Sequence, residues 1–165
     1  CITKGVPDMY LRGDVHRIVQ SPGWVMMLNE FIHDVRDIPV DGRPHLGANI
    51  RNWNGDPRGH WEGDTLVVET RNLRPESMIN REPLSREGVL IERFTLADAN
   101  TLDYRMTVVD PRTWTAAWTV RLPIPRDNSY AIYEYGCHEG NYAMFNLLKG
   151  SRVEEKRREA GSTQP

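Results

Sequence analysis

The sequence contains no apolar run approaching the roughly 20 residues that a membrane-spanning helix needs. It also has little net charge, because 21 Lys and Arg stand against 23 Asp and Glu, interspersed along the chain, giving −2. A basic stripe of the kind that binds a phosphate backbone is therefore missing. These absences exclude a membrane-spanning helix and argue against a nucleic-acid partner.

Local catalytic and cofactor motifs are absent as well. There is no Gly-x-Ser-x-Gly, no phosphate-cradling loop and no dinucleotide fingerprint. The five histidines show neither His-x-His nor His-x-x-x-His spacing, the usual arrangements of zinc and copper ligands. Ligands converging from separate strands are the alternative. The sequence predicts no metal and no cofactor.

Cysteine is scarce, and Cys1 and Cys137 lie near opposite ends of the chain. A disulfide between them would close a loop of about 135 residues, worth roughly 5 kcal/mol in the loop-entropy description. It would place the protein in a periplasm or outside the cell. Two free thiols, or Cys1 as a lipidated mature N-terminus, are the alternatives. Because the chain begins at Cys1 in a loop-like segment, we expect any targeting segment to have been removed.

Short β-type segments separated by turn signals make up most of the 165 residues, which is the length of one domain. The long loops expected are 46–59 and 74–87, rich in turn residues, and Glu62-Gly63-Asp64 is a hairpin turn. A helix is predicted from Ala143. We expect one domain over 1–150 and a charged helix or tail over 151–165. The predicted strands and hairpin cover 16–20, 24–31, 33–40, 60–73, 89–97, 101–110, 114–123 and 130–137.

Polar and apolar residues alternate most clearly in 101–110. Leu102, Tyr104, Met106 and Val108 share one face, which indicates a sheet with one buried and one wet side. Eight or nine such strands joined mainly by tight turns predict an all-β antiparallel meander with a C-terminal helix. Closing the meander, fully or nearly, into a lipocalin-like barrel would remove its exposed edges.

Three histidine–carboxylate pairs are the candidates for acid–base catalysis, because a carboxylate beside an imidazole fixes its tautomer and its protonation. Each has a structural alternative: a turn residue, a cross-strand ion pair beside Trp61, or a polar capping turn past the last strand. Cys137 is better explained as half of a disulfide than as a nucleophile, since Glu134 and Glu139 lie nearby. The candidate catalytic residues are His33 and Asp34, His60 and Glu62, and His138 and Glu139.

Four further residues are candidate ligand-binding groups. Arg36 follows the His33–Asp34 bend, and Arg43 with His45 belongs to the "DGRPH" turn, where they would hold an anionic group or shape a hairpin. Trp53 lies in the polar loop "NIRNWNGD", where an indole would cover or stack on a ligand.

From "GHWEGDTLVVETRNL" onward the chain resembles a family of uncharacterised secreted bacterial proteins. The shared features are the "DGRPH" turn (41–45), the Trp-Glu-Gly-Asp-Thr block (59–70), "ERF" (92–94), "WTV" (118–120) and "EYGC" (134–137). The resemblance covers most of 1–150 and implies export, a β-rich fold and a cysteine pair, but no activity. Family members often carry "GHSVGRW" and "HPHS", where this chain has "GDPRGHW" and "REPLS". Histidines of that family have therefore been lost or replaced here.

Three functions are compatible with these features. The first is an exported barrel that binds a small molecule at its mouth, lined by the loops 46–59 and 74–87. The second is a lyase, isomerase or hydrolase that transfers protons in the same cavity. The third is a structural or accessory subunit of an extracellular or envelope complex. The partners expected are accordingly a small-molecule ligand and, as the alternative, a second copy of the chain or an envelope-complex component.

Overall fold

The computed structural model describes residues 3, 5, 6, 10, 15–79, 82–136 and 138–162. Cys1 and Cys137 lie outside the described residues, and so does the disulfide predicted between them. The chain divides into two compact units, one running up to Tyr135 and the other beginning at Gly136. Each unit is described by itself.

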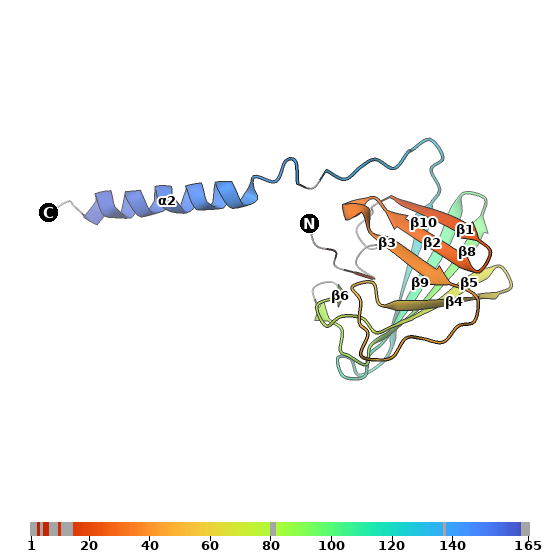
Figure 1. Cartoon of the computed structure of the whole chain (residues 1–165). Helices are drawn as coiled ribbons and strands as arrows, with labels where there is room; N and C mark the ends of the chain where they lie inside the picture. The colour runs from red at the N-terminus through yellow and green to blue at the C-terminus, as the bar shows by residue number, and fades with distance from the viewer. Residues whose placement is uncertain are drawn as a thin grey trace. The chain divides into compact units, whose positions relative to one another are not determined.

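The first unit contains a three-stranded antiparallel sheet in the order β1-β2-β3 (Figure 1). Gly23, at φ +78°, closes the tight turn between β1 and β2, a conformation that glycine adopts without steric cost. A short 3-10 helix, η1 (Phe31–His33), joins β2 to β3. The strands are β1 (His16–Ser21), β2 (Trp24–Asn29) and β3 (Val35–Pro39).

A five-stranded antiparallel sheet, in the order β10-β9-β8-β5-β4, forms the rest of the fold. The β4–β5 hairpin turns at Gly63, with φ +58°, as the Glu-Gly-Asp signal predicts. The expectation of an antiparallel β protein with a C-terminal helix is confirmed. The strands are β4 (Asp56–Glu62), β5 (Thr65–Arg71), β8 (Val89–Asp98), β9 (Thr101–Val109) and β10 (Trp118–Pro125), with β6 (Met78–Ile79) and β7 (Glu82–Pro83) pairing separately.

Two predicted loops contain strands, the strand predicted over 130–137 is not formed by its described residues, and the strand predicted over 114–123 begins at Trp118. Strand β4 begins at Asp56, inside the predicted loop 46–59, and it tolerates Pro57 because it is an edge strand. The predicted loop 74–87 contains β6 and β7. The described residues 130–136 form no strand, since side chains rather than a neighbouring strand hold this segment: Tyr130 donates to Glu30, and the Tyr135 amide donates to His33.

The hydrophobic core lies between the two sheets. Val25, Met27 and Ile38 come from the three-stranded sheet, and the alternating residues of β9 come from the other. The predicted alternation is confirmed, since Tyr104, Met106 and Val108 are fully buried while Arg105 is exposed. The inward residues of the edge strand β10 are only half-buried. They are Trp118, Val120, Leu122 and Ile124.

A buried ion pair joins the two sheets within this core. The guanidinium of Arg36 in β3 binds the carboxylate of Glu92 in β8 through both terminal nitrogens, and both side chains are fully buried. Tyr104 donates to Glu92 at 3.0 Å, while Tyr10 accepts from Arg36 at 3.1 Å. Burial raises the pKa of Tyr10 to about 12, so its hydroxyl keeps its proton. This network occupies the space where an open barrel would hold a ligand.

The carboxyl group of Asp110, just after β9, is expected to make the stability of the fold depend on pH. Burial alone would raise the pKa of its carboxyl, but hydrogen bonds from the Ser85 hydroxyl and amide and from Thr113 outweigh burial and lower it. A lowered folded-state pKa contributes stability above the unfolded value, about 3.9, and loses it as pH falls through the folded value.

We therefore expect Asp110→Asn to be less stable than the natural chain at pH 6, with the difference shrinking steadily below pH 4. Urea unfolding across pH 2 to 7 measures this difference. A difference independent of pH would show that the carboxylate charge plays no part.

The second unit consists of a turn at 138–140 and the helix α2 (Ala143–Ser162). Its described side chains are exposed. No described helix is long and apolar enough to span a membrane.

Candidate functional site

The "DGRPH" turn after β3 is fixed by its own side chains. Gly42 adopts φ +79°, and the Asp41 carboxylate accepts from both the amide and the guanidinium of Arg43. The hydrogen bonds from the Arg43 guanidinium are the main reason that the pKa of Asp41 is lowered. The same guanidinium lies 4.6 Å from the ring centre of Trp24, within range of a cation–π interaction.

Gly59 in β4 allows the chain around this turn to pass close to the five-stranded sheet. A Cβ atom at this position would lie 2.8 Å from Val40 and 2.9 Å from Ile38. The close approach brings His45 beside the outer face of β4 and β5, the face turned away from the core.

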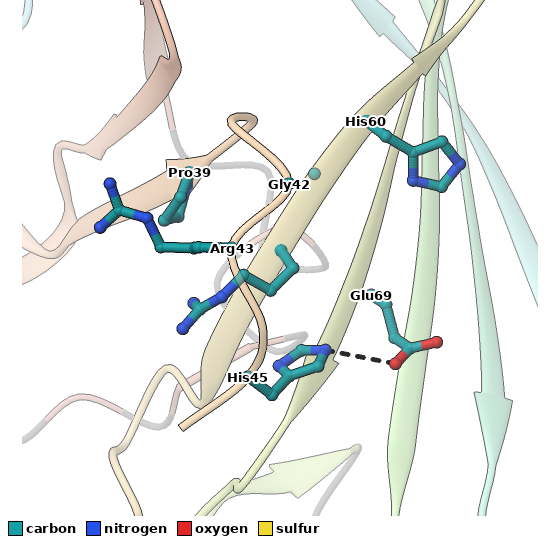
Figure 2. A pocket seen from close by; sticks show the side chains of 8 residues that line it. Pro39, Gly42, Arg43, His45, His60 and Glu69 are labelled. Carbon is teal, nitrogen blue, oxygen red and sulfur yellow. Dashed lines mark ion pairs between the residues drawn. The ribbon is translucent and has the colours of Figure 1, made fainter. Parts of the chain in front are cut away.

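His45 is held there between two carboxylates. Its Nδ1 lies 3.0 Å from Asp56 in β4. Its Nε2 lies 3.2 Å from Glu69 in β5, the contact drawn as a dashed line in Figure 2. Both contacts are hydrogen bonds only when both ring nitrogens carry protons. Asp56 is itself nearly buried and also accepts from the Leu46 amide at 2.7 Å and from Arg58 at 2.6 Å. The pKa of Glu69 is lowered, mainly by its hydrogen bond from Arg71 and secondarily by His45.

A surface hollow of about 270 Å³ opens beside this imidazole. Figure 2 shows side chains of the 39–45 segment and of β4 and β5 around it. Four of its eight lining residues are basic and one, Glu69, is acidic. The lining residues are Pro39, Gly42, Arg43, His45, Arg58, Gly59, His60 and Glu69.

A second hollow, of about 410 Å³, shares Pro39 and Arg58 with the first. Asp34, Arg36 and Trp53 are among its lining residues. The Asp34 carboxylate accepts from the Asn54 side chain at 2.7 Å and from Thr3, and the Arg74 guanidinium lies 4.9 Å from the Trp53 ring centre. The Asp34 carboxylate is therefore already bound by two residues that line the same hollow, Thr3 and Asn54.

The structure groups the ligand-binding candidates from the sequence into these two hollows. Arg43 and His45 line the first together with His60, while Arg36 and Trp53 line the second. The Arg36 side chain, however, is fully buried in its ion pair with Glu92, so it supports the wall of the hollow from within.

Within the first unit, the catalytic candidates His33 and His60 make separate contacts. His33 accepts a hydrogen bond from the Tyr135 amide at 3.0 Å, which is a structural role. His60 and Glu62 share the outer face of β4, as strand parity predicts, and lie 3.2 Å apart, with Arg93 on the other Glu62 oxygen. The pKa of Glu62 is lowered, first by Arg93 and then by His60. His138 and Glu139 belong to the second unit.

Asp56, Arg58 and Glu69 were missed from the sequence. The sequence pattern predicts a loop for Asp56 and Arg58. In the structure both belong to β4, where alternate residues share a face, so they lie on the same face as His60. Glu69 sits at the outward position paired with Arg58 in the β4–β5 ladder. Extending the predicted hairpin back to residue 56 would have found all three.

Within the residues that the structure describes, no group of three or more His, Cys, Asp or Glu side chains is arranged to hold a metal ion. Comparison with known proteins found no matching family model, no similar curated protein and no similar solved structure. The functional assignment therefore depends on the geometry of the site.

Proposed function

We propose that this protein binds a small molecule carrying a carboxylate or phosphate group in the hollow beside His45. The observation that carries the proposal is the clamped imidazole of His45, with the guanidinium-bearing residues Arg43 and Arg58 lining the same hollow. Each of these three groups already contacts a carboxylate, and these contacts hold them at one surface depression. Guanidinium donors that remain there suit an acidic ligand.

The guanidinium of Arg58 is fixed by its contacts and still has a hydrogen-bond donor that is free of contacts with described residues. Arg58 donates from Nε to the Pro44 carbonyl and from Nη1 to Asp56 and the Pro57 carbonyl. Its Nη2 makes no hydrogen bond to a residue in the described part of the chain. A ligand oxyanion can take this donor without breaking the contacts that fix the guanidinium. Glu69 supplies an acceptor for a ligand hydroxyl.

The hollow lies outside the core, and this position follows from how the interior is filled. The buried pair Arg36–Glu92 and the aromatic ring of Tyr104 occupy the space between the sheets. An apolar ligand in a barrel interior would have to displace them. We therefore assign binding to the polar surface hollow rather than to an interior cavity.

We also propose that the two sheets are parts of one nearly closed barrel in an exported protein. Strand order follows chain order within each sheet, and the segment after β3 approaches β4 closely at Gly59. The opening would then lie between β1 and β10. Export remains the prediction made from Cys1, Cys137 and the family resemblance.

Calorimetric titration with a panel of uronic acids, hydroxycarboxylates and sugar phosphates tests the binding function, with the neutral sugars as matched controls. We expect acidic members to bind and their neutral counterparts not to bind. Arg58→Gln and Arg43→Gln should each weaken binding about tenfold or more, or about 1.4 kcal/mol, whereas Arg126→Gln, outside the hollow, should leave it unchanged. Equal binding of acidic and neutral members would contradict the proposal.

A proton-transfer enzyme in the same hollow is the second candidate. The specific observation in its favour is the contact of His45 Nδ1 with the nearly buried Asp56, since a carboxylate on one ring nitrogen fixes the orientation of the ring. Nε2 faces Glu69 in this structure, so a substrate would replace that contact to exchange a proton with the ring. Nuclear magnetic resonance spectra of the same panel, recorded over a day with the protein present, distinguish the two: new resonances indicate turnover, and unchanged compounds indicate binding alone.

A further inference from the structure

Three arginines stand in direct register on the outer face of the five-stranded sheet. Arg93 in β8 pairs with Arg105 in β9, and Arg105 pairs with Arg121 in β10. Adjacent strands are about 4.8 Å apart, so the three side chains form a row across the sheet at that spacing. The row is well exposed, with 41%, 51% and 66% of the three side chains accessible to solvent.

Two carboxylates keep this arginine row ordered without neutralising it fully. Asp103 binds Arg105 at 2.8 Å and Arg121 at 2.6 Å, while Glu62 binds Arg93 at 2.5 Å. The hydrogen bond from Arg121 is the largest reason that the pKa of Asp103 is lowered, so the Asp103 carboxylate stays ionised at neutral pH. Three positive charges thus face two negative ones.

Each guanidinium keeps donors available for a ligand. Among contacts with described residues, Arg93 is held through Nη2 and Arg121 through Nε. A guanidinium carries five N–H groups, so several remain directed to solvent. A guanidinium that is already held through one nitrogen loses little conformational freedom when an anion binds its other N–H groups.

The arrangement is costly for folding alone. Like charges directly opposite each other on adjacent strands are destabilising, and here two such pairs are adjacent. Solubility of the sheet face does not require such arginine pairs, because opposite charges at the paired positions would keep the face soluble and would stabilise the sheet. Asp103 offsets part of this repulsion by binding both Arg105 and Arg121, and the positive charge that remains is available to an anionic partner.

Threonine hydroxyls flank the row on both sides. Thr65 and Thr95 lie 2.8 Å apart across β5 and β8, and Thr107 and Thr119 lie 2.8 Å apart across β9 and β10. They surround the charged row with groups that both donate and accept hydrogen bonds, which suits the hydroxyls of a sugar chain.

We propose that this outer face binds a linear acidic polysaccharide, a chain of uronate units laid across the strands along Arg93, Arg105 and Arg121. The row spans two strand spacings, about 10 Å, so the carboxylates that an extended uronate chain turns toward the sheet meet guanidiniums of the row. This surface adjoins the small-molecule hollow through Glu62, which contacts both His60 and Arg93, but the proposal does not depend on binding in the hollow.

Other polyanions fit the surface less well. Single-stranded nucleic acid is bound by stacking its bases on aromatic side chains. The residues beside the row on this face are not aromatic: Val67, Ile91, Thr95, Asp103, Thr107, Thr119 and Pro123. Insertion into an anionic membrane surface needs exposed apolar side chains beside the basic ones, whereas Val67, the partner of Arg93, is buried and Ile91 is half-buried.

The test is titration of the full chain with oligomeric polygalacturonate, using neutral dextran oligomers as the control, at 20 and 150 mM salt. We expect binding of the acidic oligomer that weakens with salt, and no binding of dextran. The triple variant Arg93→Gln, Arg105→Gln, Arg121→Gln should lose at least tenfold in affinity. A control triple variant, Arg17→Gln, Arg112→Gln, Arg126→Gln, removes the same charge elsewhere and should lose less than twofold.

The single variant Arg121→Gln, on an edge strand, provides a second readout if the triple variant folds poorly, and should lose about threefold. Three results would each overturn the proposal: no binding of polygalacturonate by the natural chain, equal losses in the two triple variants, or preference for single-stranded DNA or phosphatidylglycerol vesicles over the acidic oligomer.

Discussion

Replacing Arg36 by alanine is expected to lower the free energy of unfolding by about 3–5 kcal/mol, the usual cost of removing one partner of a buried ion pair. The loss arises because Glu92 would remain fully buried with its charge uncompensated. The hydrogen bonds from the Tyr104 and Thr70 hydroxyls do not replace a bidentate guanidinium. Equilibrium urea unfolding of the two proteins measures the difference.

A matched double variant separates burial of an unpaired charge from loss of packing. Arg36→Met combined with Glu92→Leu removes both charges and keeps most of the volume, so we expect it to recover much of the stability lost in Arg36→Ala. If the double variant were as unstable as Arg36→Ala, the ion pair would not be the source of the effect. A loss below about 1 kcal/mol in Arg36→Ala would contradict its burial.

Gly55→Ala is the second change expected to have a large effect, about 2–5 kcal/mol, because two costs add. The backbone at Gly55 has φ +67°, where a side chain is strained. The added Cβ would also lie 2.5 Å from the Thr70 methyl group and 2.7 Å from the Arg71 carbonyl oxygen, so β4 and β5 would have to separate. Thermal or urea unfolding measures the loss.

Gly42→Ala is the matched control for this variant. Gly42 has a similar φ, +79°, but a Cβ there would meet no atom within 4 Å. Its substitution should cost only the backbone strain, about 1–2 kcal/mol, so the difference between the two variants reports the crowding at Gly55. Equal losses would show that the contact with β5 is not tight.

The sequence predicted the strands well where alternation and turn chemistry agreed. Residues 101–110 alternate strictly, and the strand observed there, β9, ends one residue earlier, at Val109. The Glu62-Gly63-Asp64 signal located the β4–β5 hairpin, because few residues other than glycine adopt the positive φ found at Gly63.

The segments that were misread are those in which long-range contacts decide the structure. Residues 130–136 have the aromatic content of a strand, but Tyr130 and Tyr135 bind Glu30 and His33, about 100 residues earlier. Conversely, Asp56 and Pro57 look like loop residues, yet they pair with Arg71 and Thr70 at the sheet edge. Periodicity in a single segment contains no information about such partners.

At the site, too, the residues recognisable from their sequence neighbours were predicted, and those brought in by long-range contacts were not. Arg43, His45 and His60 were named from their own surroundings in the sequence, and all three line the hollow. The carboxylates that hold His45 come from two different strands, 11 and 24 residues further on in the chain, at Asp56 and Glu69. Only the crossing of the 41–46 segment over β4 brings these groups together.

The central claim is that an acidic small molecule binds at the hollow beside His45 and not between the sheets. The most direct measurement is the change in backbone amide resonances of the isotope-labelled chain during titration with the strongest acidic ligand of the panel. We expect the changes to centre on Arg43, His45, His60 and Glu69, with the amides of Tyr104 and Met106 unmoved. Changes centred on those core residues, or no changes with any acidic compound, would contradict the account.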